Sequence, residues 1–124
     1  MCKLLMSINP EHVENILSGE KRYEYRKTKC KEDVDTILIY STSPIMKIVG
    51  EVEVKGIIKD SPNAVWSKTA SAAGIDKSFF DKYYAGRAFA VAYVLGKVHR
   101  FKTPQTLEYY GIKSAPQSYV YIRA

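Results

Sequence analysis

The stretch from Ile45 to Ile58 restricts the possible folds more than any other part of the chain. Charged and apolar side chains alternate along it, in the order Glu51, Val52, Glu53, Val54 and Lys55, which is the pattern of a half-buried strand. Gly50 and Gly56 interrupt this pattern at positions suited to a bulge or a bend. A strand of this length with two bend points predicts a sheet that curls into a small barrel.

The rest of the chain predicts the elements that surround this strand. Further strand patterns occur at residues 3–8, 22–28, 36–40, 88–101 and 118–122. Capping and stop residues predict three helices, the first from Asn9 to Gly19, the second from Ser61 to Gly74 and the third from Asp76 to Gly86. Residues 104–111 are expected to form a short helix or a loop. The sequence therefore predicts the α+β class, with a barrel of about five to six strands and flanking helices.

Two groups of side chains on the helices are assigned to packing or to the surface. Phe79, Phe80, Tyr83 and Tyr84 form an aromatic stripe at helical spacing, which we expect to pack in the core. Trp66 is also expected in the core, with a role as a stacking platform as the alternative. His12 lies off the apolar face of the first helix, and we expect it on the surface.

Length and composition indicate one ordinary globular domain, residues 1–124, with 46% hydrophobic and 26% charged residues. No apolar run approaches the roughly 20 residues that span a bilayer, and the stretch from Met1 to Met6 is too short for a secretory signal. Cys2 and Cys30 provide neither a disulfide framework nor the spacing of a zinc site. We therefore expect a cytoplasmic protein with free thiols, no cofactor, no metal and no membrane partner.

The net charge of +6 is concentrated in two places. Residues 21–31 hold six lysines and arginines against the single acid Glu24, and a second basic group occupies residues 97–102. Ten tyrosines, four phenylalanines and one tryptophan accompany this charge. Cations bind phosphates and aromatic rings stack on unpaired bases, so this composition favours a polyanion such as single-stranded RNA. The alternative is a basic protein whose charge serves only solubility.

The stretch from Leu17 to Lys27 carries the side chains best suited to ligand binding or catalysis. It ends a helix, turns at Gly19 and continues as a strand. Strand geometry places Glu24 and Arg26 on one face, with tyrosines on the other. Lys21 lies at the mouth of the turn, where twist can carry it to either face, so its position relative to the Glu/Arg pair stays open.

These residues form the pattern Gly-x-Lys-x-x-Glu-x-Arg, at Gly19, Lys21, Glu24 and Arg26. The pattern follows a helix that starts Asn9-Pro10-Glu11, and this combination resembles the ASCH domain family of the PUA-like superfamily of small β-barrels. The resemblance extends to the strand end at residues 40–42 and to the segment 115–118. It implies a PUA-like barrel with a cleft for RNA, a nucleotide or a modified nucleoside, and it places the motif lysine in that cleft.

Several kinds of chemistry are open to this motif. Lys21 and Arg26 can bind a phosphate, and Lys21 can act as an acid or base if burial lowers its pKa. Glu24 can accept a proton from water or a ribose hydroxyl while Lys21 stabilises the developing negative charge. Family members that deacetylate 4-acetylcytidine carry a threonine three residues after the lysine. Here that position is Glu24, so only Lys21 carries over from the amidohydrolase pattern.

Three functional hypotheses follow, and the first is an RNA- or nucleotide-binding module. The second is a metal-free enzyme on the same cleft, either a ribonuclease or an acetylcytidine amidohydrolase, with Lys21 and Glu24 as catalytic residues. The third is a protein-interaction adaptor in a transcriptional regulator, with a protein partner in place of RNA. Short polar residues at strand ends complete the expected nucleic-acid site, which comprises Lys21, Arg26, Ser41, Thr42, Lys47, Gln117 and Ser118. Within that set, Ser41, Lys47 and Gln117 are predicted to lie within one ligand's reach of Lys21 and Arg26.

Overall fold

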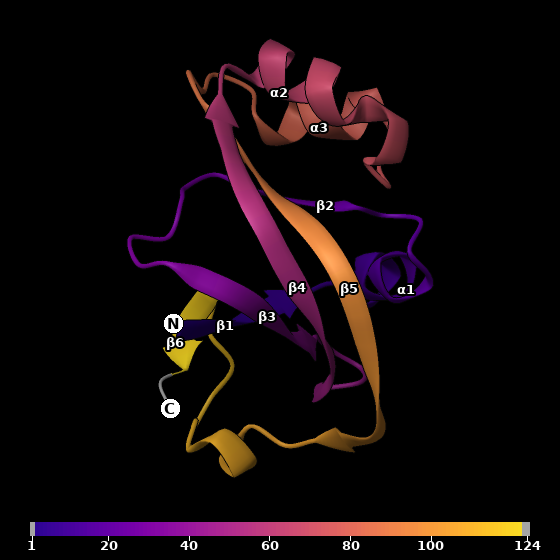
Figure 1. Cartoon of the computed structure of the whole chain (residues 1–124), viewed down its shortest axis with the longest axis vertical. Helices are drawn as coiled ribbons and strands as arrows, with labels where there is room; N and C mark the ends of the chain where they lie inside the picture. Colours follow the sequence, from indigo (N-terminus) through magenta and orange to yellow (C-terminus); the bar gives the residue numbers. More distant parts are fainter. Residues whose placement is uncertain (1, 123–124) are drawn as a thin grey trace.

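A computed structural model describes residues 2–122, which fold into strands and short helices (Figure 1). The six strands are β1 (Cys2–Ile8), β2 (Tyr23–Arg26), β3 (Val34–Ser41), β4 (Lys47–Asp60), β5 (Ala90–Gln105) and β6 (Tyr119–Ile122). The helices are α1 (Pro10–Ser18), α2 (Pro62–Thr69) and α3 (Lys77–Tyr83), with 3-10 turns η1 (Ala70–Ala72) and η2 (Glu108–Tyr110). The predicted α+β class is confirmed. None of the helices in the described part of the chain is long and apolar enough to cross a membrane.

All six strands belong to one sheet, in the order β2-β5-β4-β3-β1-β6. Only β1 and β3 run parallel, and the other neighbouring pairs are antiparallel. The barrel description is approximate, because β2 and β6 are edge strands and the sheet does not close through backbone pairing in the described residues. The end of β2 nevertheless lies close to the start of β6, because Arg26 donates a 3.3 Å hydrogen bond to Ser118.

The long strands β4 and β5 form the curved spine of the molecule (Figure 1). Their pairing shifts register between Ile48 and Gly50 and again on either side of Val54, as expected for the bend points predicted at Gly50 and Gly56. At Gly50 the two backbones approach closely, since an added Cβ would lie 2.7 Å from the carbonyl oxygen of His99. The strand predicted to end at Phe101 continues to Gln105.

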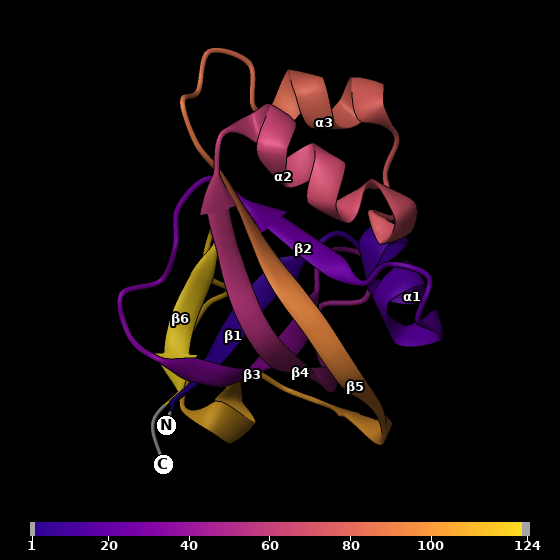
Figure 2. The same ribbon diagram turned by 45° about the horizontal axis from the view of Figure 1, so that its top comes forward.

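Helix α1 and the pair α2 and α3 cover different parts of the sheet. Helix α1 buries Val13 and Ile16 against the apolar side chains of β1 and β3. Helices α2 and α3 cover the opposite end of the molecule (Figure 2), where Phe80 and Tyr84 pack on Ala92 and its neighbours. Ala90 and Ala92 of β5 are buried, and such small residues allow the helices to approach closely.

The two glycines of β4 give a matched test of the bend. Gly50→Ala is expected to lower the free energy of unfolding by about 1–3 kcal/mol, because the new methyl group meets the β5 backbone and cannot be relieved by a side-chain rotation. Gly56→Ala is the control, since no atom lies within 4 Å of an added Cβ there. Urea unfolding of both variants measures the difference, and equal losses would contradict the assignment of Gly50 to close strand approach.

Candidate functional site

A cavity of about 250 Å³ opens between the end of β1, strand β2 and the segment that leads into α3. Its polar side is formed by Lys21, Glu24 and Arg26, so the structure brings the three motif residues into one pocket. The opposite wall is apolar and aromatic, with Ile75, Phe79 and Tyr83. Ser7, Asn9 and His12 line the remainder, together with Ile8 and Tyr25. The open question about the position of Lys21 is thereby answered.

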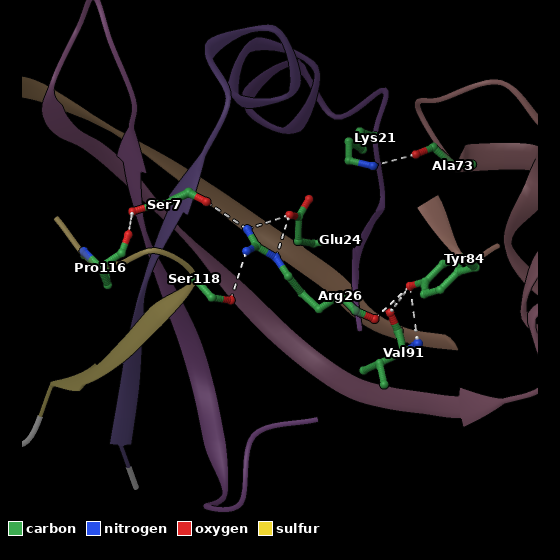
Figure 3. Close-up of polar contacts among 9 residues, drawn as sticks. All are labelled: Ser7, Lys21, Glu24, Arg26, Ala73, Tyr84, Val91, Pro116 and Ser118. Carbon is green, nitrogen blue, oxygen red and sulfur yellow. Dashed lines mark hydrogen bonds and ion pairs between the residues drawn. The ribbon is translucent and has the colours of Figure 1, made fainter. Parts of the chain in front are cut away.

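Lys21 is held almost completely out of water, with 2% of its surface exposed. Its ammonium group donates a hydrogen bond of 2.8 Å to the carbonyl oxygen of Ala73 (Figure 3) and lies 4.8 Å from the ring centroid of Tyr25. Gly74 makes room for the aliphatic part of the side chain, because an added Cβ would lie 2.5 Å from Lys21 Cβ. The segment after α2 therefore forms a fitted wall around this lysine.

Burial has a direct electrostatic consequence for these two side chains. Removal from water lowers the pKa of Lys21; Glu24 acts in the opposite direction, and Arg26 adds to the lowering. Burial also raises the pKa of Tyr25 to about 12, although its hydroxyl donates a 2.7 Å hydrogen bond to Thr69. Lys21 is consequently a better proton donor than an exposed lysine.

Glu24 and Arg26 form an ion pair at the floor of the cavity. The Arg26 Nη2 atom lies 2.9 Å from Glu24 Oε2, and both side chains are largely buried, with exposed fractions of 14% and 8% for Arg26 and Glu24. Their contact confirms the prediction that the two residues share one face of the strand. Figure 3 shows the other carboxylate oxygen of Glu24 directed away from Arg26. That oxygen takes no part in the ion pair.

The guanidinium of Arg26 also reaches across the open edge of the sheet. It donates a 2.9 Å hydrogen bond to the carbonyl oxygen of Ser7 in β1 and a 3.3 Å hydrogen bond to Oγ of Ser118, just before β6. The Ser7 hydroxyl also donates a 2.7 Å hydrogen bond to the carbonyl oxygen of Pro116, in the segment before β6. The two Arg26 contacts join β2 to the β1/β6 edge, with which β2 has no backbone pairing among the described residues (Figure 3).

The remaining residues of the predicted site lie outside the cavity lining. Ser41 is buried in the sheet, paired with Ile8 and Lys47. Thr42 donates its backbone N–H to the carbonyl oxygen of Ile8 and does not line the cavity. Lys47 and Gln117 are exposed, and neither lines the cavity. Binding by these four residues stays a prediction, and Ser118 reaches the site through its contact with Arg26.

Sequence reasoning missed the aromatic wall of the cavity. The residues expected as one core stripe divide into two: Phe80 and Tyr84 are buried, whereas Phe79 is 50% exposed and lines the cavity with Tyr83. The sequence spacing could have predicted this division, because residues 79 and 83 lie on one helix face while residues 80 and 84 lie on the next. His12 also lines the cavity, edge-on to Phe79 at 5.7 Å. Its Nδ1 atom is buried without a hydrogen-bond partner among the described residues.

The cavity lining combines charged and aromatic side chains. Across residues 2–122, no three His, Cys, Asp or Glu side chains lie close enough together to hold a metal ion. The polar groups that face the ligand space are instead an ammonium, a carboxylate and a guanidinium.

A curled mixed sheet with a basic cavity beside its open edge defines the class of this protein, a PUA-like domain. The sequence profile of the ASCH domain matches residues 6–105, and the chain belongs to the ASCH domain family.

Individual relatives differ in how much of their length this chain covers. Large ribosomal subunit protein uL22 of Ureaplasma parvum is 27% identical over 121 residues, which are 97% of this chain and 39% of that protein. ATP synthase subunit alpha of the same organism is 26% identical over 97% of this chain but 15% of its own length. An ASCH domain-containing ribonuclease of Zymomonas mobilis is 27% identical over 92 residues, 73% of this chain and 62% of that protein. The chain thus spans less than two thirds of each of these relatives.

Solved structures agree with the fold. The crystal structure of ASCH from Zymomonas mobilis superimposes with a TM-score of 0.89 at 25% identity, covering 98% of this chain and 87% of that chain. A mutant form of the same protein gives a TM-score of 0.89 at 24% identity, covering 98% and 88%. The arrangement of the six strands and three helices is therefore that of the ASCH fold.

The buried ion pair predicts non-additive losses of stability. Arg26→Met leaves the Glu24 carboxylate buried without its cation and is expected to cost about 3–5 kcal/mol. Adding Glu24→Gln to this variant removes the unpaired charge, so the double variant should be more stable than the sum of the single losses predicts. Urea unfolding of the two single variants and the double variant measures the coupling. Strictly additive losses would show that the pair contributes no such interaction.

The lowered pKa of Lys21 predicts a pH dependence with a defined sign. Between the folded-state value and the ordinary 10.5, the unfolded chain binds more protons at this site than the folded chain does. The stability contributed by the site therefore rises with pH in that window. The free energy of unfolding of the wild type minus that of Lys21→Met should increase as the pH approaches 10.5. Urea titrations across the alkaline range test this, and a difference that falls with pH would contradict it.

Proposed function

We propose that this ASCH domain binds single-stranded RNA and holds one nucleotide in the cavity formed by Lys21, Glu24 and Arg26. The observation that carries the proposal is the pairing of a charged floor with an accessible aromatic wall in one cavity. The cations attract phosphate, while Phe79 and Tyr83 offer ring faces to a base. A base must be unstacked and unpaired to reach such a wall, which favours a single strand over a duplex.

The size of the cavity supports one nucleotide rather than several. Its volume of about 250 Å³ falls just below the roughly 300–1,000 Å³ typical of sites for drug-sized ligands. The Zymomonas mobilis relative is named a ribonuclease, which supports RNA as the polymer from which that nucleotide comes. Arg26 is already bonded to Glu24, Ser7 and Ser118, so its contribution to the ligand is chiefly its positive charge.

Cleavage of the bound RNA is the second candidate, and the chemistry of Lys21 and Glu24 favours it. The free oxygen of Glu24 accepts the proton of a ribose 2′-hydroxyl, and the resulting O2′ attacks the adjacent phosphorus. The O2′–P bond forms as the P–O5′ bond breaks, and the Lys21 ammonium, with its lowered pKa, donates a proton to the departing O5′. The products are a 2′,3′-cyclic phosphate and a 5′-hydroxyl, with no change in oxidation state.

Two variants separate binding from cleavage. Lys21→Met should weaken binding of a labelled single-stranded RNA by about tenfold and reduce the slope of log affinity against log salt by about 0.7, because one phosphate contact is lost. Glu24→Gln should keep binding within a few-fold of the wild type while slowing cleavage by about 100-fold or more. Fluorescence anisotropy measures the first effect, and gel analysis of the RNA products in the presence of chelator measures the second.

Lys102→Met is the matched control, since Lys102 is exposed on β5 and does not line this cavity. Its affinity and cleavage rate should equal those of the wild type. Absence of RNA binding by the wild type at low salt would overturn the proposal. Binding without cleavage would retain the first candidate and remove the second.

A further inference from the structure

A second basic groove lies next to the cavity and is not used by the proposed chemistry. Its volume is about 430 Å³. It is formed by the segment after β2, the end of β4 and the loop that connects α3 to β5, at the end of the molecule that carries the two stacked helices (Figure 2). Its charged and aromatic lining consists of Lys27, Lys29, Lys59, Arg87 and Phe89.

The charge of this groove is unbalanced. Four of its lining residues are cations, and no aspartate or glutamate lines it. None of the four forms an ion pair with a carboxylate within residues 2–122. Like charges held close together repel each other, and a bound polyanion relieves that repulsion. The groove therefore fits a ligand with repeated negative charges.

Aromatic rings accompany the cations and connect the groove to the cavity. Phe89 is 55% exposed, and Lys59 Nζ lies 5.3 Å from its ring centroid. Lys27 Nζ lies 4.9 Å from the ring centroid of Tyr83, and Tyr83 lines the cavity. Lys27 therefore lines the groove while its ammonium group contacts a ring of the cavity wall, which links the two linings.

We propose that this groove is a second subsite, which holds the phosphate backbone and an unpaired base of the strand whose neighbouring nucleotide occupies the cavity. The inference rests on the proposed function, since it assigns the path of the same RNA. Lys27, Lys29, Lys59 and Arg87 contact phosphates, and Phe89 stacks on a base, the combination used by sequence-tolerant single-strand sites. A concave groove with an exposed ring suits a flexible strand better than a flat membrane surface or an acidic peptide without bases.

The test compares ligands of two lengths. A ribonucleoside monophosphate reaches only the cavity, whereas a single-stranded RNA of about 12 nucleotides covers both sites. In the double variant Lys59→Met/Arg87→Met, affinity for the long RNA should fall at least about tenfold and the salt slope should decrease by about 1.4, for two lost phosphate contacts. Affinity for the monophosphate should stay unchanged. Phe89→Ala should weaken the long RNA with no change in salt slope, because stacking releases no counterions.

Controls separate this inference from the proposed function. Lys102→Met should match the wild type with both ligands, and thermal unfolding verifies that every variant is folded. Equal affinity of the groove variants and the wild type for long RNA, with Lys21→Met impaired, would overturn the second subsite and leave the proposed function intact. Loss of binding to an acidic peptide or to anionic vesicles, with RNA binding unchanged, would also overturn it. A wild type that binds neither ligand would remove both proposals.

Discussion

The guanidinium of Arg26 is the contact on which the rest of the site depends. The sheet ends at two edge strands that do not pair with each other in the described residues. The Arg26 side chain bonds to Glu24 on the β2 side of that opening and to Ser7 and Ser118 on the β1/β6 side. Backbone pairing between the two edge strands would have closed this opening completely. A side-chain bridge instead closes the curl and leaves space beside it. Arg26 both makes this bridge and lines the cavity beside it.

The same bridge explains why a carboxylate can be buried in the cavity. Glu24 is largely out of water, which is unfavourable for a charged group unless a cation is close. Arg26 supplies that cation, and its own orientation is held by Ser7 and Ser118. Stability and the proposed chemistry are therefore coupled at this point, since the interactions that hold Arg26 across the open edge of the sheet also hold the Glu24 carboxylate.

Burial divides the basic residues of the chain into two kinds. Lys21 is enclosed by the segment after α2, and its altered pKa suits proton transfer at a fixed position. The lysines and arginine of the neighbouring groove are exposed and lack carboxylate partners in the described chain, which suits attraction of a mobile polyanion. One short segment, from Lys21 to Lys29, supplies residues to both. The net charge of the chain does not distinguish a residue suited to proton transfer from one suited to attracting a polyanion.

Local periodicity determined the elements, because strand alternation, helix caps and bend glycines act between near neighbours in sequence. It also determined that Glu24 and Arg26 share a face, and the motif indicated the family. Only the tertiary structure decided that β1 pairs with β3 in parallel, that Lys21 enters the same pocket as Glu24, and that Phe79 and His12 line it. It also placed Ser41, Lys47 and Gln117 outside the cavity lining. These outcomes depend on contacts between segments far apart in the chain, such as Lys21 with Ala73 and Arg26 with Ser118. The local spacing of residues in one segment carries no information about which distant segment packs against that segment.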